Sequence, residues 1–301
     1  MDDAPTLSVE INPSHQTPPP LAVFDADALG LQRLGGGVIT EHWCGPNKRF
    51  EILSIERAQP ADQDPATTVK DAYRELFATA QAHGWSDAVR IWQFIPAINE
   101  GHGDQERYRR FCVGRAAALD ELGLVDHRMC AATAIGTRDA TFRLMALFAE
   151  QPGRSIENPR QISAWQYPRQ YGPISPAFAR ATTVPLNGVD DTQGLALMVS
   201  GTAAVVGHAS AYPGDVLAQT DEAMTNVDAV LAEAQRVTGH AMGTVGANSV
   251  VRAYLRQPNH WAEVANAIEQ RWPDAAIMGL QGDVCRAELL VELEAWHAIH
   301  P

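Results

Sequence analysis

The sequence predicts an α+β protein made of two tandem α/β halves, with mixed sheets packed by helices. Apolar, strand-like runs alternate with segments of helical spacing up to about residue 150. The same order of elements recurs after a polar, Pro-rich passage, so the repetition is one of element order and not of residues. With 301 residues and 46% hydrophobic content, the chain can also bury two cores of ordinary size. We therefore expect an N-terminal half over residues 1–150 and a C-terminal half over residues 151–301.

The N-terminal half begins with residues 1–20, whose Pro, Asp and Thr content is typical of a frayed lead-in. The elements predicted after it are bounded by turn formers and helix breakers. They are a hairpin over 35–58 with its turn at 44–47, a helix over 65–83 that stops at Gly84, a strand over 88–95 that Pro96 ends, a helix over 105–122, and strands near 130–135 and 141–148.

The C-terminal half begins with a Pro-rich passage, residues 151–176, which we interpret as a crossing between the halves. Strand-like and helical patterns then follow in the same order as before. The predicted elements are strands over 195–200 and 203–207, a helix over 215–234, a strand over 249–255, a helix over 260–271, and a closing strand that reaches residue 294.

Charge and composition exclude several classes of function. The formal net charge is -13, from 23 Lys and Arg against 36 Asp and Glu, which argues against a nucleic-acid surface and against attraction to anionic lipid. No apolar run approaches the roughly 18 residues that span a bilayer, so we expect no membrane segment. None of the ten His residues has the spacing of a zinc motif, so a metal site is not expected.

Cysteine usage predicts a reducing compartment. The four cysteines are widely scattered and form no CxxC pair, and the acidic start of the chain carries no apolar signal sequence. We therefore expect a cytoplasmic protein. A Cys-His-Asp protease is not expected, because no His lies at a telling spacing from a Cys and a nucleophile needs a base in contact with it.

Carboxylates interrupt the closing apolar segment. Leu290, Val291 and Leu293 do not fit one simple alternation with Glu292, so at least one acid must face solvent or lie beside apolar neighbours. A carboxyl group among apolar neighbours has a raised pKa and can donate a proton near neutrality. The alternative is that Glu292 and Glu294 form the solvent face of an edge strand, since charged residues are mostly exposed.

Arginines are concentrated in residues 107–115, near the first turns of the second predicted helix. Guanidinium groups pair bidentately with carboxylates, so this cluster on an acidic protein suggests a carboxylated ligand. For Arg109 and Arg110 we favour ordinary surface ion pairs with nearby acids instead. For Arg115, on the more apolar side, both interpretations stay open.

Two further segments offer candidate ligand contacts. Tyr167, Arg169 and Tyr171 lie on a stretch that prolines hold extended, which suits a ligand wall. The alternative is a packed linker whose tyrosines fill the seam between the halves. The small residues 200–203, at the end of a predicted strand, would let a backbone or a ligand approach closely, although small size alone is a weak signal. The reactivity of Cys285 stays open, because the adjacent Arg286 favours a thiolate and burial opposes it.

Five segments, taken in chain order, resemble the chorismatase family over most of the chain from about Ile91 onward. They are residues 88–99, 107–115, 158–180, 200–208 and 282–294, the last with Gly282-Asp283-Val284-Cys285-Arg286. The second half also resembles the trimeric RidA-like imine deaminase fold, to which chorismatases are related. That likeness lies in Gly214, Asp215, Gln219, Thr220 and Asn226. The fold that this implies is two tandem RidA-like (chorismate-mutase-like) halves, of which the first is degenerate and the second carries the catalytic Glu. In the RidA-like family a basic residue is expected shortly before the last strand, where this chain has residues 274–277 without one, which weakens the case for imine deamination.

The resemblance implies that the substrate is chorismate, a dicarboxylate with an enolpyruvyl ether, and that no metal or organic cofactor is needed. Cleavage to pyruvate and a ring product requires protonation of the terminal methylene of the ether, which creates an oxocarbenium ion. The catalyst therefore needs one protonated acid beside groups that hold anions. The family match assigns the acid to Glu292. It assigns substrate binding to Arg115 and Arg169 as carboxylate clamps, to Tyr108, Tyr167 and Tyr171 around the ring, and to the small residues Gly201, Thr202 and Ala203.

Within the family, some members let water attack and release a dihydroxycyclohexadiene carboxylate, whereas others yield a hydroxybenzoate. Cys285 in its Gly-Asp-Val-Cys-Arg context resembles the second branch, which forms 3-hydroxybenzoate or both the 3- and 4-hydroxy isomers. A polarisable thiol would steer a ring intermediate and restrict water, and Ala203 would also help to set the product. We thus expect a lyase of aromatic biosynthesis. The competing interpretations are the hydrolase branch and a RidA-like imine deaminase or metabolite-binding trimer, and a homo-oligomeric state stays open.

Overall fold

The structure, a computed structural model, describes residues 32–33, 39, 41–44, 49–60, 62–124, 129–187 and 193–299. The elements up to the change of sheet are β1 (Gln32–Arg33), β2 (Glu41–Cys44), β3 (Phe50–Ala58), α1 (Pro65–Ala82), β4 (Ala88–Pro96), η3 (Gly103–Gln105), α2 (Arg107–Glu121), β5 (Ala131–Thr137) and β6 (Thr141–Ala149). The elements after it are β7 (Arg154–Ile156), η4 (Ala164–Gln166), η5 (Arg169–Tyr171), β8 (Ala181–Asn187), β9 (Gln193–Ala203), β10 (Val205–Val206), β11 (Ala209–Ser210), α3 (Val216–Thr238), β12 (Ser249–Leu255), η6 (Pro258–His260), α4 (Trp261–Arg271), β13 (Ala276–Gln281) and β14 (Val291–Ile299).

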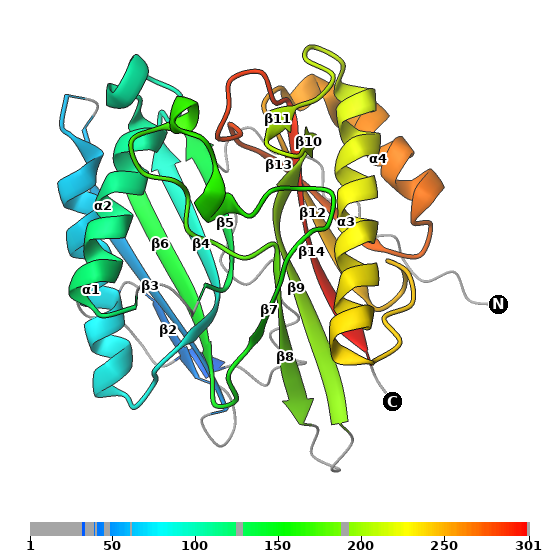
Figure 1. Cartoon of the computed structure of the whole chain (residues 1–301), viewed down its shortest axis with the longest axis horizontal. Helices are drawn as coiled ribbons and strands as arrows, with labels where there is room; N and C mark the ends of the chain where they lie inside the picture. Colours follow the sequence, from blue (N-terminus) through cyan, green and yellow to red (C-terminus); the bar gives the residue numbers. More distant parts are fainter. Residues whose placement is uncertain are drawn as a thin grey trace.

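Two mixed six-stranded sheets form the centre of the molecule, which confirms the predicted α+β class. The first has the order β1-β2-β3-β6-β4-β5 and the second β13-β12-β14-β9-β8-β7. Each contains one parallel pair, β4 with β5 and β12 with β13, among antiparallel neighbours. Figure 1 shows α1 and α2 on the outer side of the first sheet and α3 and α4 on the outer side of the second. The chain changes sheet between Ala149 and Arg154, and the expected division into two domains at this place stays a prediction.

Local sequence signals explain where the long helices begin and end. The side chain of Asp64 accepts a hydrogen bond from the backbone N–H of Ala66 and caps α1, with Pro65 in the first turn. In the same way Asp215 caps α3, which ends at Gly239 in the left-handed conformation. The α3 helix runs four residues further than predicted, and α2 begins after a short 3₁₀ turn.

The structure corrects the prediction of two strands at 195–200 and 203–207. Gln193–Ala203 is one continuous strand, β9, which a short hairpin of β10 and β11 follows. Gly201 lies within β9 at an irregularity in the register with β14, and it does not end the strand because its φ is not positive. The crossing at 151–176 contains β7 and two 3₁₀ turns. The lead-in expected at 1–20 lies outside the described residues, and of the turn expected at 44–47 only residue 44 is described.

Two further strands were not predicted. In β8, Pro185 weakens the sequence pattern of a strand. β7 pairs only with the part of β8 before Pro185, so Pro185 lies on an open edge of the sheet, where its missing N–H costs nothing. The β13 strand contains Gly279, where an added Cβ would lie 2.6 Å from the ring of Trp261. Close packing of that ring explains a glycine that weakens the sequence pattern.

Four apolar clusters of buried residues build the core of the described part of the chain, and the smallest consists of Ala203, Ala204, Val205, Val284 and Leu289. One lies between α1, α2 and the first sheet, and a second lies between α3, α4 and the second sheet. A third joins the inner faces of the two sheets, with Trp92 and Phe94 from β4 against Tyr254 and Trp296 of the second sheet. The molecule is therefore a four-layer arrangement in which buried residues of the two sheets meet at the centre (Figure 1).

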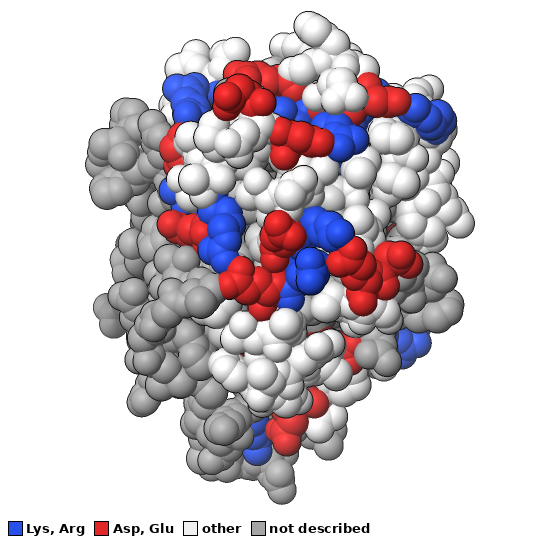
Figure 2. Space-filling model, turned by 90° about the vertical axis from the view of Figure 1, so that its left-hand side faces the viewer, with Lys and Arg blue, Asp and Glu red and all other residues white. Residues whose placement is uncertain are grey.

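The outer surface carries charges of both signs. Figure 2 shows acidic and basic side chains interleaved over the face of α1 and α2, where Lys70 pairs with Glu121 and Arg110 with Asp64. Interleaved signs do not form the single basic surface that binds nucleic acid. Among the described helices, none is both long enough and apolar enough to cross a membrane.

Candidate active site

A cavity of about 410 Å³ lies between the two halves, where the start of α2, the crossing segment, the end of β9 and the loop before β14 meet. Figure 1 shows these segments together at the upper end of the two sheets. The structure brings most of the predicted site residues into the wall of this cavity. They are Tyr108, Tyr167, Tyr171, Gly201, Ala203, Cys285 and Glu292.

Glu292 lies on an interior strand. β14 pairs with β12 on one side and β9 on the other, with Tyr254 and Ala203 opposite Glu292. The acid is only 5% exposed, so the alternative of a solvent-facing edge strand is wrong. Val291 and Leu293 point into the core beneath α3, which leaves Glu292 on the opposite face, toward the cavity and the first sheet.

Burial, and after it the negative charge of Glu294, raise the pKa of Glu292 to about 8 against the opposing effect of Arg90 and Arg180. A carboxyl group with this pKa carries its proton through most of the neutral range. The cavity wall therefore contains a carboxylic acid that is able to act as a proton donor, and this role of Glu292 stays a prediction.

Gly201 makes room for this acid. A Cβ placed on Gly201 would lie 1.9 Å from Oε1 of Glu292 and 3.1 Å from Cγ2 of Thr133. Since no β-carbon can approach an oxygen so closely, only glycine at this position allows the Glu292 carboxyl its place against β9.

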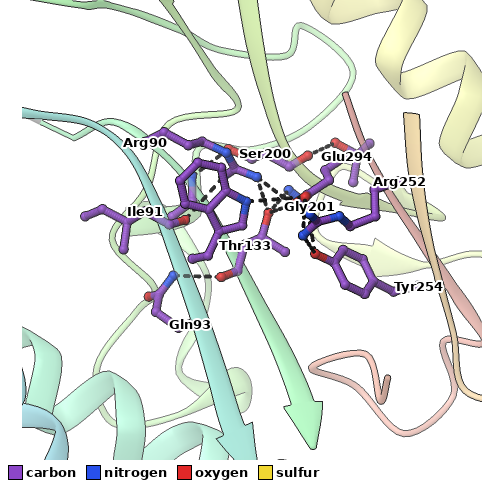
Figure 3. Close-up of polar contacts among 12 residues, drawn as sticks. Arg90, Ile91, Gln93, Thr133, Ser200, Gly201, Arg252, Tyr254 and Glu294 are labelled. Carbon is purple, nitrogen blue, oxygen red and sulfur yellow. Dashed lines mark hydrogen bonds and ion pairs between the residues drawn. The ribbon is translucent and has the colours of Figure 1, made fainter. Parts of the chain in front are cut away.

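A second acid on the same face, Glu294, is surrounded by donors and cations (Figure 3). Its Oε2 accepts from Arg90 at 2.7 Å and from Oγ1 of Thr133 at 2.6 Å, and its Oε1 lies 3.2 Å from Nη1 of Arg252. Oε1 also accepts from Trp92 and from Tyr254, whose hydroxyl accepts from Arg252. We call these residues, Arg90, Trp92, Thr133, Arg252, Tyr254 and Glu294, the Glu294 cluster.

The Glu294 cluster is tied to the cavity wall through Thr133. Oγ1 of Thr133 accepts from the backbone N–H of Gly201 at 2.9 Å while it donates to Glu294. The cluster thus fixes the backbone against which the Glu292 carboxyl lies. Within the cluster, the negative charge of Glu294 is the second cause of the raised pKa of Glu292, whereas Arg90 lowers that pKa.

Two arginines supply positive charge to the cavity, and the sequence analysis did not single out either as a clamp. Arg286 lies over the ring of Tyr171 at 4.1 Å and over that of Tyr167 at 5.3 Å, and it donates to the carbonyl of His208. Arg180 is buried and donates to the hydroxyl of Tyr167 at 2.9 Å. Among the described residues, no carboxylate lies within ion-pair distance of these two guanidinium groups. They are therefore able to receive the carboxylates of a ligand.

The thiol and the phenol beside Glu292 are neutral. Burial, and after it the nearby Glu292, raise the pKa of Cys285 to about 12, so the side chain is a thiol and not a thiolate. Burial also holds the pKa of Tyr108 well above its ordinary value. Within the described part of the chain, no three His, Cys, Asp or Glu side chains are grouped as metal ligands would be.

The structure places three other predicted residues away from this cavity. Arg115 lines a separate cavity and lies over the ring of Tyr73. Arg169 is an exposed side chain that donates to Asp104. Thr202 is buried, and its hydroxyl donates to the carbonyl of Ser200.

Arg109 and Arg110 of α2 both form ion pairs as expected, but only Arg109 does so with one of the nearby acids that were expected as partners, Asp104, Glu106 and Asp120. Arg109 pairs with Glu106 at 2.7 Å, and Arg110 pairs with Asp64. Arg109 and Glu106 also belong to the cavity wall, but their charges already oppose each other.

Comparison with known proteins agrees with this geometry. Residues 42–148 match the family described as chorismatase FkbO/Hyg5-like, N-terminal. A 3-hydroxybenzoate synthase of Streptomyces hygroscopicus is 36% identical over 228 residues, which cover 74% of this chain and 67% of that protein. A chorismatase of Streptomyces rapamycinicus is 34% identical with the same coverage. A solved chorismatase structure superposes with a TM-score of 0.77 at 31% identity and covers 88% of this chain and 79% of the other. The chain belongs to the chorismatase family.

Proposed function

We propose that this protein is a lyase that cleaves chorismate to pyruvate and a hydroxybenzoate, with Glu292 as the proton donor. The observation that carries the proposal is a buried acid, Glu292, whose pKa is raised to about 8. It lies in the wall of a cavity that also holds two guanidinium groups with no carboxylate partner among the described residues. The curated relatives named chorismatase and 3-hydroxybenzoate synthase support the choice of substrate.

The first step is proton transfer to carbon. The carboxyl O–H of Glu292 breaks, and the π electrons of the enolpyruvyl double bond form a new C–H bond at the terminal methylene. The ether carbon becomes an oxocarbenium ion and Glu292 becomes a carboxylate, so charge and protons balance. Because the site is buried, the new carboxylate lies close to the cation that it has generated and stabilises it.

The second step determines the ring product. Hydroxybenzoate and pyruvate together contain the atoms of chorismate, so this branch consumes no water, whereas the dihydroxycyclohexadiene product requires one water molecule. The neutral Cys285 thiol and Ala203 line the cavity beside Glu292 and reduce the polar surface that would hold a water. The 3-hydroxybenzoate synthase relative also favours the branch without water, with 3-hydroxybenzoate as the main product and 4-hydroxybenzoate as a second isomer.

Substrate binding follows from the charges in the cavity. Arg180 and Arg286 hold the two carboxylates, in place of the Arg115 and Arg169 expected from the sequence. Tyr108, Tyr167 and Tyr171 orient the ring. Replacing Arg286 by Gln should raise KM for chorismate roughly 10- to 100-fold, the loss expected for hydrogen bonds to a charged group.

The decisive experiment is incubation of the purified protein with chorismate. Pyruvate is followed by a coupled assay, and the ring products are separated by chromatography. We expect pyruvate and a hydroxybenzoate in equal amounts, and almost none of either from the Glu292→Gln variant. Absence of pyruvate from the folded wild-type protein would overturn the proposal, and a dihydroxycyclohexadiene product would assign the hydrolase branch.

The second candidate is an imine deaminase or a metabolite-binding trimer. Ammonia release from an amino-acid-derived imine, without pyruvate from chorismate, would favour it. A cytoplasmic location and a homotrimer stay predictions, and light scattering in solution measures the second.

A further inference from the structure

A second cavity, of about 320 Å³, lies on the other side of the crossing segment from the first. Its walls come from α1, the start of β4, the later turns of α2 and residues 165–177, and none of its lining residues lines the first cavity. The lining is mainly apolar, with Phe77, Ile91 and Leu119 among its side chains. A cavity of about 150 Å³ holds a benzene ring, so this one has room for a substituted ring.

A buried cation faces this apolar space. Arg115 is 6% exposed and lines the cavity, and its guanidinium group lies over the ring of Tyr73, whose centroid is 5.8 Å away. Among the described residues, no carboxylate lies within ion-pair distance of Arg115, and its buried Nε has no hydrogen-bond partner. A buried charge without a partner is costly, so a ligand carboxylate would satisfy a group that the described residues leave without a counterion.

The rim of the cavity points to the rest of the ligand. Trp165 and Ile174 both line the cavity and are 41% and 40% exposed, so the rim of the cavity carries uncovered apolar surface. Asp87 also lines the cavity and accepts from Ser86. An apolar ring would cover the exposed side chains, and a ring hydroxyl would be able to donate to Asp87.

We propose that the second cavity binds an aromatic monocarboxylate, with its carboxylate on Arg115 and its ring against Trp165. Hydroxybenzoates belong to this class, so the site would respond to the product if the proposed function holds. The crossing segment connects the two cavities: Trp165 and Ile174 face the second, whereas Tyr167 and Tyr171 face the first. A ligand in the second cavity would therefore restrict the segment that supplies two walls of the active site.

The test is calorimetric titration of the full chain with 3-hydroxybenzoate and, separately, with benzoate. We expect two sites in the wild-type protein. The variant Arg115→Met should lose one of them or weaken it roughly 10- to 100-fold, as expected for charge-assisted hydrogen bonds. Methionine suits the apolar surroundings, so this variant should fold. The matched control is Arg110→Met on the same helix, at a residue that lines neither cavity, and it should keep both sites.

Two further measurements separate the sites and the sources of failure. Arg286→Gln should lose the first site and keep the one that depends on Arg115. Trp165→Ala changes an exposed side chain and should weaken the second site even if Arg115→Met does not fold. Equal binding of the neutral isostere benzamide, or two intact sites in Arg115→Met, would overturn the proposal. The proposal would also be overturned if the wild-type protein formed an oligomer, bound benzoate at one site only, and dissociated on the change Trp165→Ala. In that case a second copy of the chain, and not a ligand, would cover Trp165. Because no turnover is measured, Arg115-dependent binding can be found even if chorismate is not cleaved.

Discussion

The carboxyl group of Glu292 occupies the space in which a side chain of Gly201 would lie. An added Cβ on Gly201 would be 1.9 Å from Oε1 of Glu292, and both residues line the cavity between the halves. The position of the acid is thus determined by the absence of a side chain on the neighbouring strand.

Gly201→Ala should therefore displace the Glu292 carboxyl and lower kcat by about 10²-fold or more, the low end of the contribution of a general acid. The matched control is Gly246→Ala, since the nearest atom to an added Cβ there is 3.8 Å away and its φ is not positive. Steady-state kinetics of both variants with chorismate checks this. Full activity in Gly201→Ala would mean that the carboxyl does not act from its present position.

The rate should depend on the proton of Glu292. Its raised pKa, about 8, predicts that kcat/KM is constant near pH 6 to 7 and falls about tenfold per pH unit above 8. Glu292→Gln should lose roughly 10²–10⁴-fold in kcat and lose this pH dependence. Circular dichroism across the same range controls for unfolding. A profile that stays level to pH 10 would assign the proton donor to another group.

The same pKa has a consequence for stability. The folded-state pKa of Glu292 is raised from 4.5 to about 8. The contribution of Glu292 to the free energy of unfolding is therefore fully present below pH 4.5 and is lost as the pH rises to 8. Glu292→Gln removes this loss. Relative to the wild type, the variant should therefore gain a few kcal/mol in free energy of unfolding between pH 5 and pH 9, at about 1.4 kcal/mol per pKa unit. Urea unfolding of both proteins at pH 5 and at pH 9 measures this gain. The exposed Glu288→Gln is the control, and an equal change in both variants would contradict the argument.

Cys285 should affect the product more than the rate. Because its thiol is neutral and adjoins Glu292, Cys285→Ala leaves the acid in place but opens space for water. We expect a changed ratio of ring products with total pyruvate within about tenfold of wild type. Cys112→Ala, a buried cysteine outside the cavity wall, should keep the ratio. An identical product profile for Cys285→Ala would remove its role in steering.

Thr133 should matter for both stability and catalysis. Thr133→Val keeps the shape but leaves the Gly201 N–H without its acceptor, which should cost about 1–3 kcal/mol and lower kcat. Thr182 offers a matched control, because its hydroxyl accepts from the backbone N–H of Ala131 at 2.7 Å, whereas Thr133 is the one bonded to Gly201 and Glu294. We expect Thr182→Val to lose stability and keep kcat. Equal kcat in both variants would limit Thr133 to a structural role.

Much of the fold could be predicted from the sequence, because amphipathic spacing and caps such as Asp64 and Asp215 are local signals. The local sequence also singled out Glu292, as an acid that breaks the alternation of an apolar strand. The burial of Glu292 could not be predicted in this way, since it depends on β9 and β12 pairing on both sides of β14.

The arginines show the limit of local patterns. Tyr108 and Arg115 lie on one helix seven residues apart, or roughly 10 Å along its axis, so they reach different cavities. Arg286 gains its role from stacking on Tyr167 and Tyr171, more than 100 residues earlier in the chain. Contacts between residues so far apart in the sequence are set by the packing of the two halves, and they leave no pattern in the sequence.

The buried pair of Arg90 and Glu294 joins a strand of one sheet to a strand of the other. Separating the sheets would leave Arg90 without its carboxylate, although Glu294 would keep Arg252 of its own sheet, and would expose the apolar inner faces of both sheets. The whole chain should consequently melt in one cooperative transition. A fragment comprising only one of the sheets would present an incomplete ionic and aromatic face, and so would aggregate or remain unfolded unless its complement were supplied.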